Sequence, residues 1–208
     1  PQGEFRLKGS KIDTTNYPAV RTALWVGTLN NDAQIETTNN DNGELAYRIV
    51  GDPTEGSILV AAAKAGATQE DLNQAYPREN EIPFDSVRKR MVTIHAVKAP
   101  SAEDISPFQE KPDQTWYTVA IKGAPDVVLN LCSQVQSMDS QSTRPMDEEA
   151  RKQILSANDA MTRDALRVLG VAYRLVPVQP EEVNSEALEK DLIFVGLIGM
   201  IDPARPEV

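Results

Sequence analysis

Two pairs of strand-like runs, each joined by a short turn, constrain the fold of this chain more than any other feature. The first pair is Ala33–Glu36 and Glu44–Val50, joined across a polar turn at 38–43, and the second is Glu81–Asp85 and Lys89–Val97. Such short connections join antiparallel neighbours, because parallel strands need a crossover of about a dozen residues or more. The sequence therefore predicts a sheet that is largely antiparallel.

The second run of the later pair has the regular alternation of a strand. Val92 and Ile94 alternate with Thr93 and His95. This is the period of a strand with one face in the core and one face in solvent. We therefore expect a half-buried strand here.

Helical patterns fill the intervals between the strands. Asp52 is suited to cap one of these helices, Pro53 fits its first position, and Glu55 falls where a capping box places its acid. The expected helices are Pro18–Asn30, Asp52–Ala65, Thr68–Ala75, a short one through Leu131, Asp147–Leu166 and one near Glu181–Lys190, and the further strands are Thr115–Lys122, Arg167–Val176 and Leu192–Ile201. Together these elements predict an α+β fold, a largely antiparallel twisted sheet flanked by helices, in a single domain over residues 1–208.

Composition excludes several classes of function. The chain has 21 Lys and Arg against 31 Asp and Glu, a net charge of −10, which disfavours a nucleic-acid partner and docking on anionic lipid. One cysteine, Cys132, and one histidine, His95, leave no disulfide framework and no multi-histidine metal site. The longest apolar run, Leu192–Ile201, is about half the length of a spanning helix. Pro1 and Val208 are neither a natural start nor a natural stop, so we expect a piece of a larger protein.

The segment Gly51–Ser57 has the two-glycine spacing of a phosphate-binding P-loop, but the Lys-Ser/Thr pair of that loop is replaced by Ser57-Ile58. Its two acids would repel a triphosphate. Two interpretations stay open: a capped helix start, or a site where Glu55 accepts a hydrogen bond from an exocyclic amine such as that of adenine.

The segment Phe84–Met91 places an aromatic ring close to three consecutive cations, Arg88, Lys89 and Arg90. In an acidic chain this local reversal of charge is informative, because a ring can stack on a purine while cations meet its phosphates. The alternative is a core phenylalanine followed by a solvated turn.

The segment Lys122-Gly-Ala-Pro-Asp126 places a lysine at a strand end, directly before a helix start. Gly123 lacks the side chain that would keep a ligand from the backbone, and a helix N-terminus favours anionic groups. An ordinary strand-edge lysine is the alternative. Arg167 lies where a helix gives way to a strand and could contact phosphate or sugar, or pair with Asp164.

The order of these segments is more specific than any one of them. Gly51-Asp-Pro-Thr-Glu, Glu81-Ile-Pro-Phe-Asp-Ser, Lys122-Gly-Ala-Pro-Asp, Leu166-Arg-Val-Leu and Val195-Gly-Leu-Ile-Gly-Met-Ile-Asp-Pro-Ala-Arg follow one another. In this order they resemble the nucleotide-binding domain of type 2 P-type cation-transporting ATPases, closest to bacterial calcium pumps of the sarcoplasmic-reticulum type. The resemblance covers essentially the whole chain. Ala204 departs from it, because many members have a second proline at this point of the hinge.

The resemblance implies roles for individual residues. Phe84 would stack on adenine, Glu55 would lie at the adenine edge, and Arg167 would reach toward the phosphates. The complete set of implied ATP-binding residues is Phe84, Lys89, Lys122, Gly123, Glu55, Arg167, Thr54, Met91, Ala124 and Leu169.

The resemblance also implies a cytoplasmic domain of an integral membrane protein. Such a domain binds ATP, with Mg²⁺ in the full-length protein, and delivers the γ-phosphate to an aspartate in a neighbouring domain. The expected partners are therefore ATP and the phosphorylation, actuator and transmembrane domains of the same polypeptide. The Asp-Lys-Thr-Gly-Thr acceptor segment is not in this sequence, so we expect no catalytic residue and no metal site within it.

Two other hypotheses stay open. A complete soluble kinase or hydrolase is disfavoured, because neither a lysine-bearing P-loop nor a clear metal-binding carboxylate pair is present. A non-catalytic interaction domain that kept the fold and lost the ligand would be expected to have lost several pocket residues together.

Overall fold

The computed structural model describes residues 3–39, 45–108 and 113–201. The hinge motif at 202–205 and most of the predicted turn at 38–43 lie outside the described residues. No helix in the described part of the chain combines the length and the apolar character that a membrane crossing requires.

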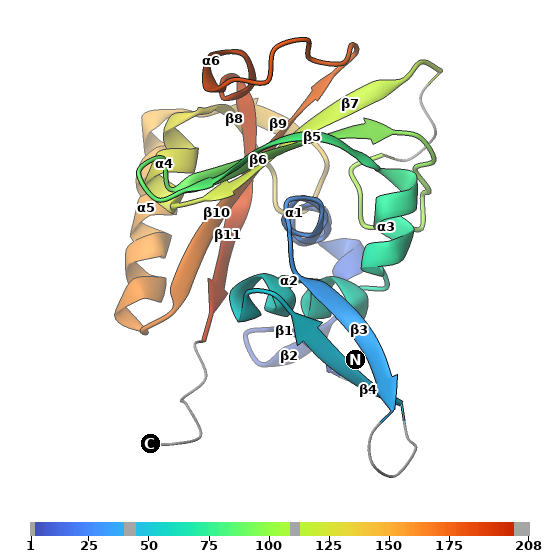
Figure 1. The fold of residues 1–208 in the computed structure, drawn as a ribbon. Helices are drawn as coiled ribbons and strands as arrows, with labels where there is room; N and C mark the ends of the chain where they lie inside the picture. Colours follow the sequence, from blue (N-terminus) through green and yellow to red (C-terminus); the bar gives the residue numbers. More distant parts are fainter. Residues whose placement is uncertain (1–2, 40–44, 109–112, 202–208) are drawn as a thin grey trace.

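A seven-stranded sheet organises the molecule (Figure 1). Its strands, in spatial order, are β5 (Arg78–Asp85), β6 (Arg90–Val97), β7 (Trp116–Gly123), β10 (Arg167–Val176), β11 (Leu192–Met200), β8 (Cys132–Gln136) and β9 (Thr143–Pro145). Neighbours are antiparallel apart from β11 and β8, which are parallel. The predicted α+β class with a largely antiparallel sheet is confirmed. Sequence reasoning missed β8 and β9, because these short, polar runs lack the alternation that marks a strand.

The remaining elements are six helices and two small two-stranded sheets in the described residues. The helices are α1 (Pro18–Leu29), α2 (Pro53–Lys64), α3 (Gln69–Ala75), α4 (Pro125–Asn130), α5 (Glu148–Arg163) and α6 (Ser185–Leu188), with one 3₁₀ turn at Thr14–Asn16, and the small sheets pair β1 (Phe5–Leu7) with β2 (Ser10–Ile12) and β3 (Gln34–Asn39) with β4 (Leu45–Val50). The expected cap is confirmed, since the Asp52 carboxylate accepts a hydrogen bond from the Thr54 N–H at 2.7 Å.

Helices cover both faces of the large sheet. α1 packs on one face, with α2 and α3 packed against α1, and α4 and α5 lie on the other face (Figure 1). Each face has its own core, one around the fully buried Trp25 and the other around Phe194.

β6 corrects one sequence expectation. It was expected to be half-buried, but Thr93 and His95 are as buried as Val92 and Ile94. The reason is that the end of α1 and Tyr76, the residue that follows α3, cover the face that the alternation assigned to solvent. His95 has one hydrogen-bond partner inside the protein, since its Nδ1 donates to the Tyr76 carbonyl at 2.9 Å.

We expect His95 to make stability depend on pH. Burial lowers the pKa of His95 from 6.5 to about 4, so between these values the unfolded chain binds a proton that the folded chain excludes. Stability is therefore lost as the pH falls. Between pH 7 and pH 5 the free energy of unfolding should drop by about 2 kcal/mol from this residue. Urea unfolding at both pH values measures the drop, and His95→Gln should remove most of it. An equal drop in the variant would contradict the assignment.

Candidate functional site

Three of the predicted site residues, Met91, Lys122 and Leu169, lie on one face of three adjacent strands. On β7, Lys122 pairs with Met91 of β6 and with Val171 of β10. Leu169 stands two positions before Val171, so it shares the same sheet face. On β5 the register passes from Ile82 opposite Val92 to Asp85 opposite Arg90.

In this register, Pro83 and Phe84 of β5 both lie opposite one residue of β6, Met91. β5 therefore has a β-bulge at this point. Bulges re-aim side chains at sheet edges, and β5 is the edge strand. Phe84 is 63% exposed, so the alternative of a core phenylalanine is wrong. β5 and β7 are two strand spacings apart, about 10 Å, which brings Phe84 and Lys122 within the reach of one aromatic heterocycle and its substituents.

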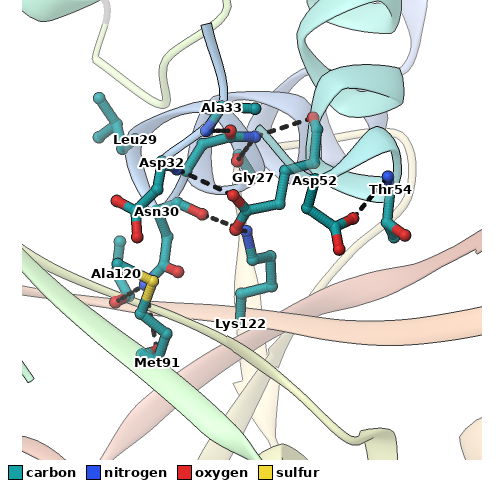
Figure 2. A network of polar contacts seen from close by, with 12 residues as sticks. Gly27, Leu29, Asn30, Asp32, Ala33, Asp52, Thr54, Met91, Ala120 and Lys122 are labelled. Atoms are coloured by element: carbon teal, nitrogen blue, oxygen red, sulfur yellow. Dashed lines mark hydrogen bonds and ion pairs between the residues drawn. The ribbon is translucent and has the colours of Figure 1, made fainter. Parts of the chain in front are cut away.

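Lys122 is buried in a polar network (Figure 2). Its ammonium donates to the Asn30 carbonyl at the C-terminal end of α1 and to Glu55 Oε1, the latter at 2.6 Å. Burial lowers the pKa of Lys122, and the charge of Glu55 opposes this shift. The negative end of a helix and a carboxylate thus stabilise a cation that burial alone would disfavour.

Glu55 joins α2 to the sheet and to the segment that follows α1. Its second oxygen, Oε2, accepts from the Asp32 N–H at 3.0 Å, and its backbone carbonyl accepts from Asn31 Nδ2 at 3.0 Å. The carboxylate therefore binds partners beyond its own helix, which corrects its expected capping-box role. The side chain is 19% exposed, and a carboxylate has room for about four donors, so a third donor can still reach it.

Sequence reasoning missed the segment Asn30-Asn31-Asp32. The Asn30 side chain donates to the carbonyls of Met91 and Ala120 at 3.1 and 2.9 Å, which fixes the end of α1 on β6 and β7 (Figure 2). The only signal for this segment in the sequence is a polar run after an apolar helix, and such a run is typical of an ordinary helix end.

Gly123 is required by the protein's own backbone. A Cβ at this position would lie 2.4 Å from the carbonyl oxygen of Lys89, which also accepts from the Ala124 N–H at 2.9 Å. The space that Gly123 leaves on this side is thus filled by the β5–β6 turn, residues 86–89. Lys89 itself is exposed and takes a left-handed conformation, with φ at 55°.

The three consecutive cations do not act as one cluster. Arg88 and Arg90 both form ion pairs with Glu189, whose side chain is 2% exposed. Lys89, between them, is exposed. Glu189 lies 99 or more residues from both arginines in the chain, so the sequence contained no signal for this pairing.

Arg167 and Thr54 meet at the start of α2. Arg167 Nη1 donates to Thr54 Oγ1 at 2.8 Å, and Thr54 follows Pro53, the first residue of α2. The two predicted residues thus come together near Glu55, with Arg167 exposed.

Other groups lie away from this site. A cavity of about 790 Å³ between the β3–β4 hairpin, α2 and α3 has none of the predicted residues in its lining. Cys132 is buried, as expected, and burial raises the pKa of its thiol to about 12. It begins β8.

Comparison with known proteins identifies the family. Residues 19–207 match the family described as "P-type ATPase, cytoplasmic domain N", and the chain belongs to this family. It is 34% identical to a calcium-transporting ATPase of Bacillus subtilis (strain 168) over 209 residues, which are 100% of this chain and 21% of that protein.

Two further relatives give the same result. The cation-transporting ATPase pma1 of Synechocystis sp. is 34% identical over 212 residues, 100% of this chain and 21% of that protein. Calcium-transporting ATPase 1 of Bacillus cereus is 37% identical over 158 residues, 76% of this chain and 16% of that protein. The chain thus spans about a fifth of the length of the relatives it matches over its whole length.

Proposed function

We propose that this chain is the ATP-binding module of a P-type cation-transporting ATPase. The observation that carries the proposal is the exposed Phe84 ring on a sheet edge, two strands from the Lys122–Glu55 pair. A flat apolar surface beside fixed charges suits a nucleotide, because the base needs a stacking partner and the phosphates need cations.

Each predicted residue has a role in this proposal. Phe84 stacks on adenine, and Met91 and Leu169 form apolar walls. Glu55 accepts from the adenine amino group, while Lys122 holds the Glu55 carboxylate in place. Lys89 and Arg167 reach the phosphates, and Thr54, Gly123 and Ala124 contribute at the margins of the site.

In the whole protein the proposed role is to deliver the γ-phosphate of ATP to an aspartate in a neighbouring domain and so couple hydrolysis to cation transport. Calcium is the proposed cation, since two of the relatives described above are named as calcium-transporting ATPases. The proposed partners are the phosphorylation, actuator and transmembrane domains of the same polypeptide, with this module on the cytoplasmic side. Mg²⁺ would enter with the nucleotide.

The chain should prefer ATP over GTP by about tenfold or more. Guanine presents a carbonyl where adenine presents an amine, so two acceptors would face each other at Glu55, and an unpaired polar group costs about 1–3 kcal/mol. Calorimetric titration with ATP and GTP measures the preference. Glu55→Gln should reduce it, because an amide can donate to the guanine carbonyl.

Controls separate this proposal from its alternatives. Equal affinities for ATP and GTP would contradict the role of Glu55. No binding of either nucleotide would favour a non-catalytic interaction domain. Steady phosphate release that survives rigorous purification would contradict a module without the acceptor aspartate.

A further inference from the structure

The β5–β6 turn carries Lys89 and directly follows the end of β5, where Phe84 lies, so the proposed function depends on how this turn is held. Within the turn, the Asp85 carboxylate accepts from the N–H groups of Val87 and Arg88 at 2.9 and 2.7 Å. The Asp85 carbonyl accepts from the Lys89 N–H at 2.6 Å. These bonds shape the turn locally, and its orientation on the sheet needs contacts from outside it.

Glu189 supplies such a contact. Its two oxygens pair with different arginines of the turn: Oε1 with Arg88, and Oε2 with Arg90, whose Nε lies 2.9 Å away. Arg90 also donates from Nη1 to the Arg88 carbonyl at 3.0 Å. One buried carboxylate therefore binds both residues that flank Lys89.

The two arginines reach Glu189 behind the sheet, that is, on the face opposite Met91 and Lys122. Arg90 precedes Met91 on β6, so their side chains leave opposite faces. Arg90 shares its face with Val92, which packs in one core cluster with Leu188, next to Glu189 in the chain. Met91 shares its face with Lys122. The arginines are thus held on the side away from the candidate site.

Glu189 is itself firmly fixed. The Leu188 side chain is fully buried. The Glu189 N–H donates to the Ser185 carbonyl at 2.9 Å, which closes α6. Arg174 of β10 donates to the carbonyls of Ala187 and Lys190, on either side of Glu189, at 2.9 and 3.2 Å. The carboxylate is therefore a rigid anchor.

We propose that Glu189 is a positioning residue for nucleotide binding. By holding Arg88 and Arg90 behind the sheet, it sets the turn in the orientation that presents Phe84 to the base and Lys89 to the phosphates. This inference rests on the proposed function and deepens it, because it names the group that aligns the stacking surface without touching the nucleotide.

Glu189→Gln tests the proposal against Glu186→Gln, a matched control at an exposed position of α6. Both changes remove one negative charge from the same segment. Charge alone predicts that ATP binds slightly more tightly to either variant and that adenosine is unaffected. A positioning role predicts the opposite for Glu189→Gln: ATP and adenosine should both bind about tenfold more weakly. Unchanged or tighter binding would overturn the proposal.

The design distinguishes this inference from the proposed function. If the unmodified chain binds no ATP, the proposed function fails before any variant is tested. If it binds ATP and Glu189→Gln binds it equally well, only the positioning role fails. If Glu189→Gln does not fold, Arg88→Gln is tested in its place. Arg90 still pairs with Glu189 in the Arg88→Gln variant. Its adenosine affinity should fall as well, and an unchanged value would overturn the proposal.

A second readout follows the turn directly. In Glu189→Gln, the amide of Ala124 should exchange with solvent faster without nucleotide, because its bond to the Lys89 carbonyl joins the turn to the end of β7. In the Phe84→Ala background, Glu189→Gln should lower adenosine affinity by no more than about twofold, because the surface it aligns is gone. An equal tenfold loss in both backgrounds would overturn the proposal.

Discussion

Lys122→Met is expected to lower the free energy of unfolding by about 3 kcal/mol, the lower end of the cost of breaking a buried ion pair. The physical reason is that Glu55, only 19% exposed, keeps its charge and loses the ammonium that balances it. Thermal and urea unfolding of the variant measure the loss. Lys190→Met, at an exposed position, is the matched control and should change stability by less than about 0.5 kcal/mol.

The double variant Lys122→Met/Glu55→Gln separates the pair from the packing of the lysine stem. It should recover most of the stability, because removing both charges is far less costly than leaving one unpaired. If single and double variants are equally unstable, the ion pair is not the cause. Because the ammonium is bound to Glu55, we also expect Lys122→Met to weaken ATP and adenosine by similar factors, and a loss confined to ATP would place the ammonium at the phosphates.

Phe84→Ala is expected to weaken ATP about tenfold to a hundredfold, since stacking on an aromatic ring contributes about 1–3 kcal/mol per base. Adenosine should lose about as much, because the lost contact is with the base. Phe84 is 63% exposed, so the change should cost less than about 1 kcal/mol of stability, whereas a core phenylalanine would cost about 3–5 kcal/mol. Nucleotide titration and thermal unfolding on the same variant measure both effects.

Val87 provides a matched control for Phe84. It lies three residues after Phe84, on the β5–β6 turn, and is 87% exposed, so Val87→Ala removes apolar surface without removing a π face. Its ATP affinity should stay within about twofold of the unmodified chain, and Phe84→Tyr and Phe84→Trp should retain most of theirs. A loss in Val87→Ala as large as in Phe84→Ala would show that turn hydrophobicity, rather than stacking, is what matters.

Much of the fold could be predicted because it depends on local patterns. Pro53 and Asp52 marked the start of α2, and the short turn before Lys89 required β5 and β6 to be antiparallel. The alternation along β6 identified a strand, but it could not reveal that both of its faces are buried. That depends on the end of α1 and on Tyr76, which come from other parts of the chain and cover the face of Thr93 and His95.

The candidate site, too, could be predicted only in part from the sequence. The residue types at Phe84, Lys122 and Glu55, and the order of their segments, are properties of the sequence alone, and they sufficed to predict the family that the comparisons confirm. Their partners were not predictable. The Lys122–Glu55 bond joins residues 67 positions apart, and the Arg88–Glu189 bond joins residues 101 positions apart.

Composition and periodicity determined which segments become strands and helices, because those choices depend on neighbours within a few residues. Only the tertiary structure decided which charges meet. Three adjacent cations look alike in the sequence, yet alternation of side chains along β6 sends Arg90 behind the sheet, and the strand order β5-β6-β7-β10 aligns Phe84 with Lys122. Ion pairs form between groups that the chain topology brings together, and topology is set by the packing of the whole core.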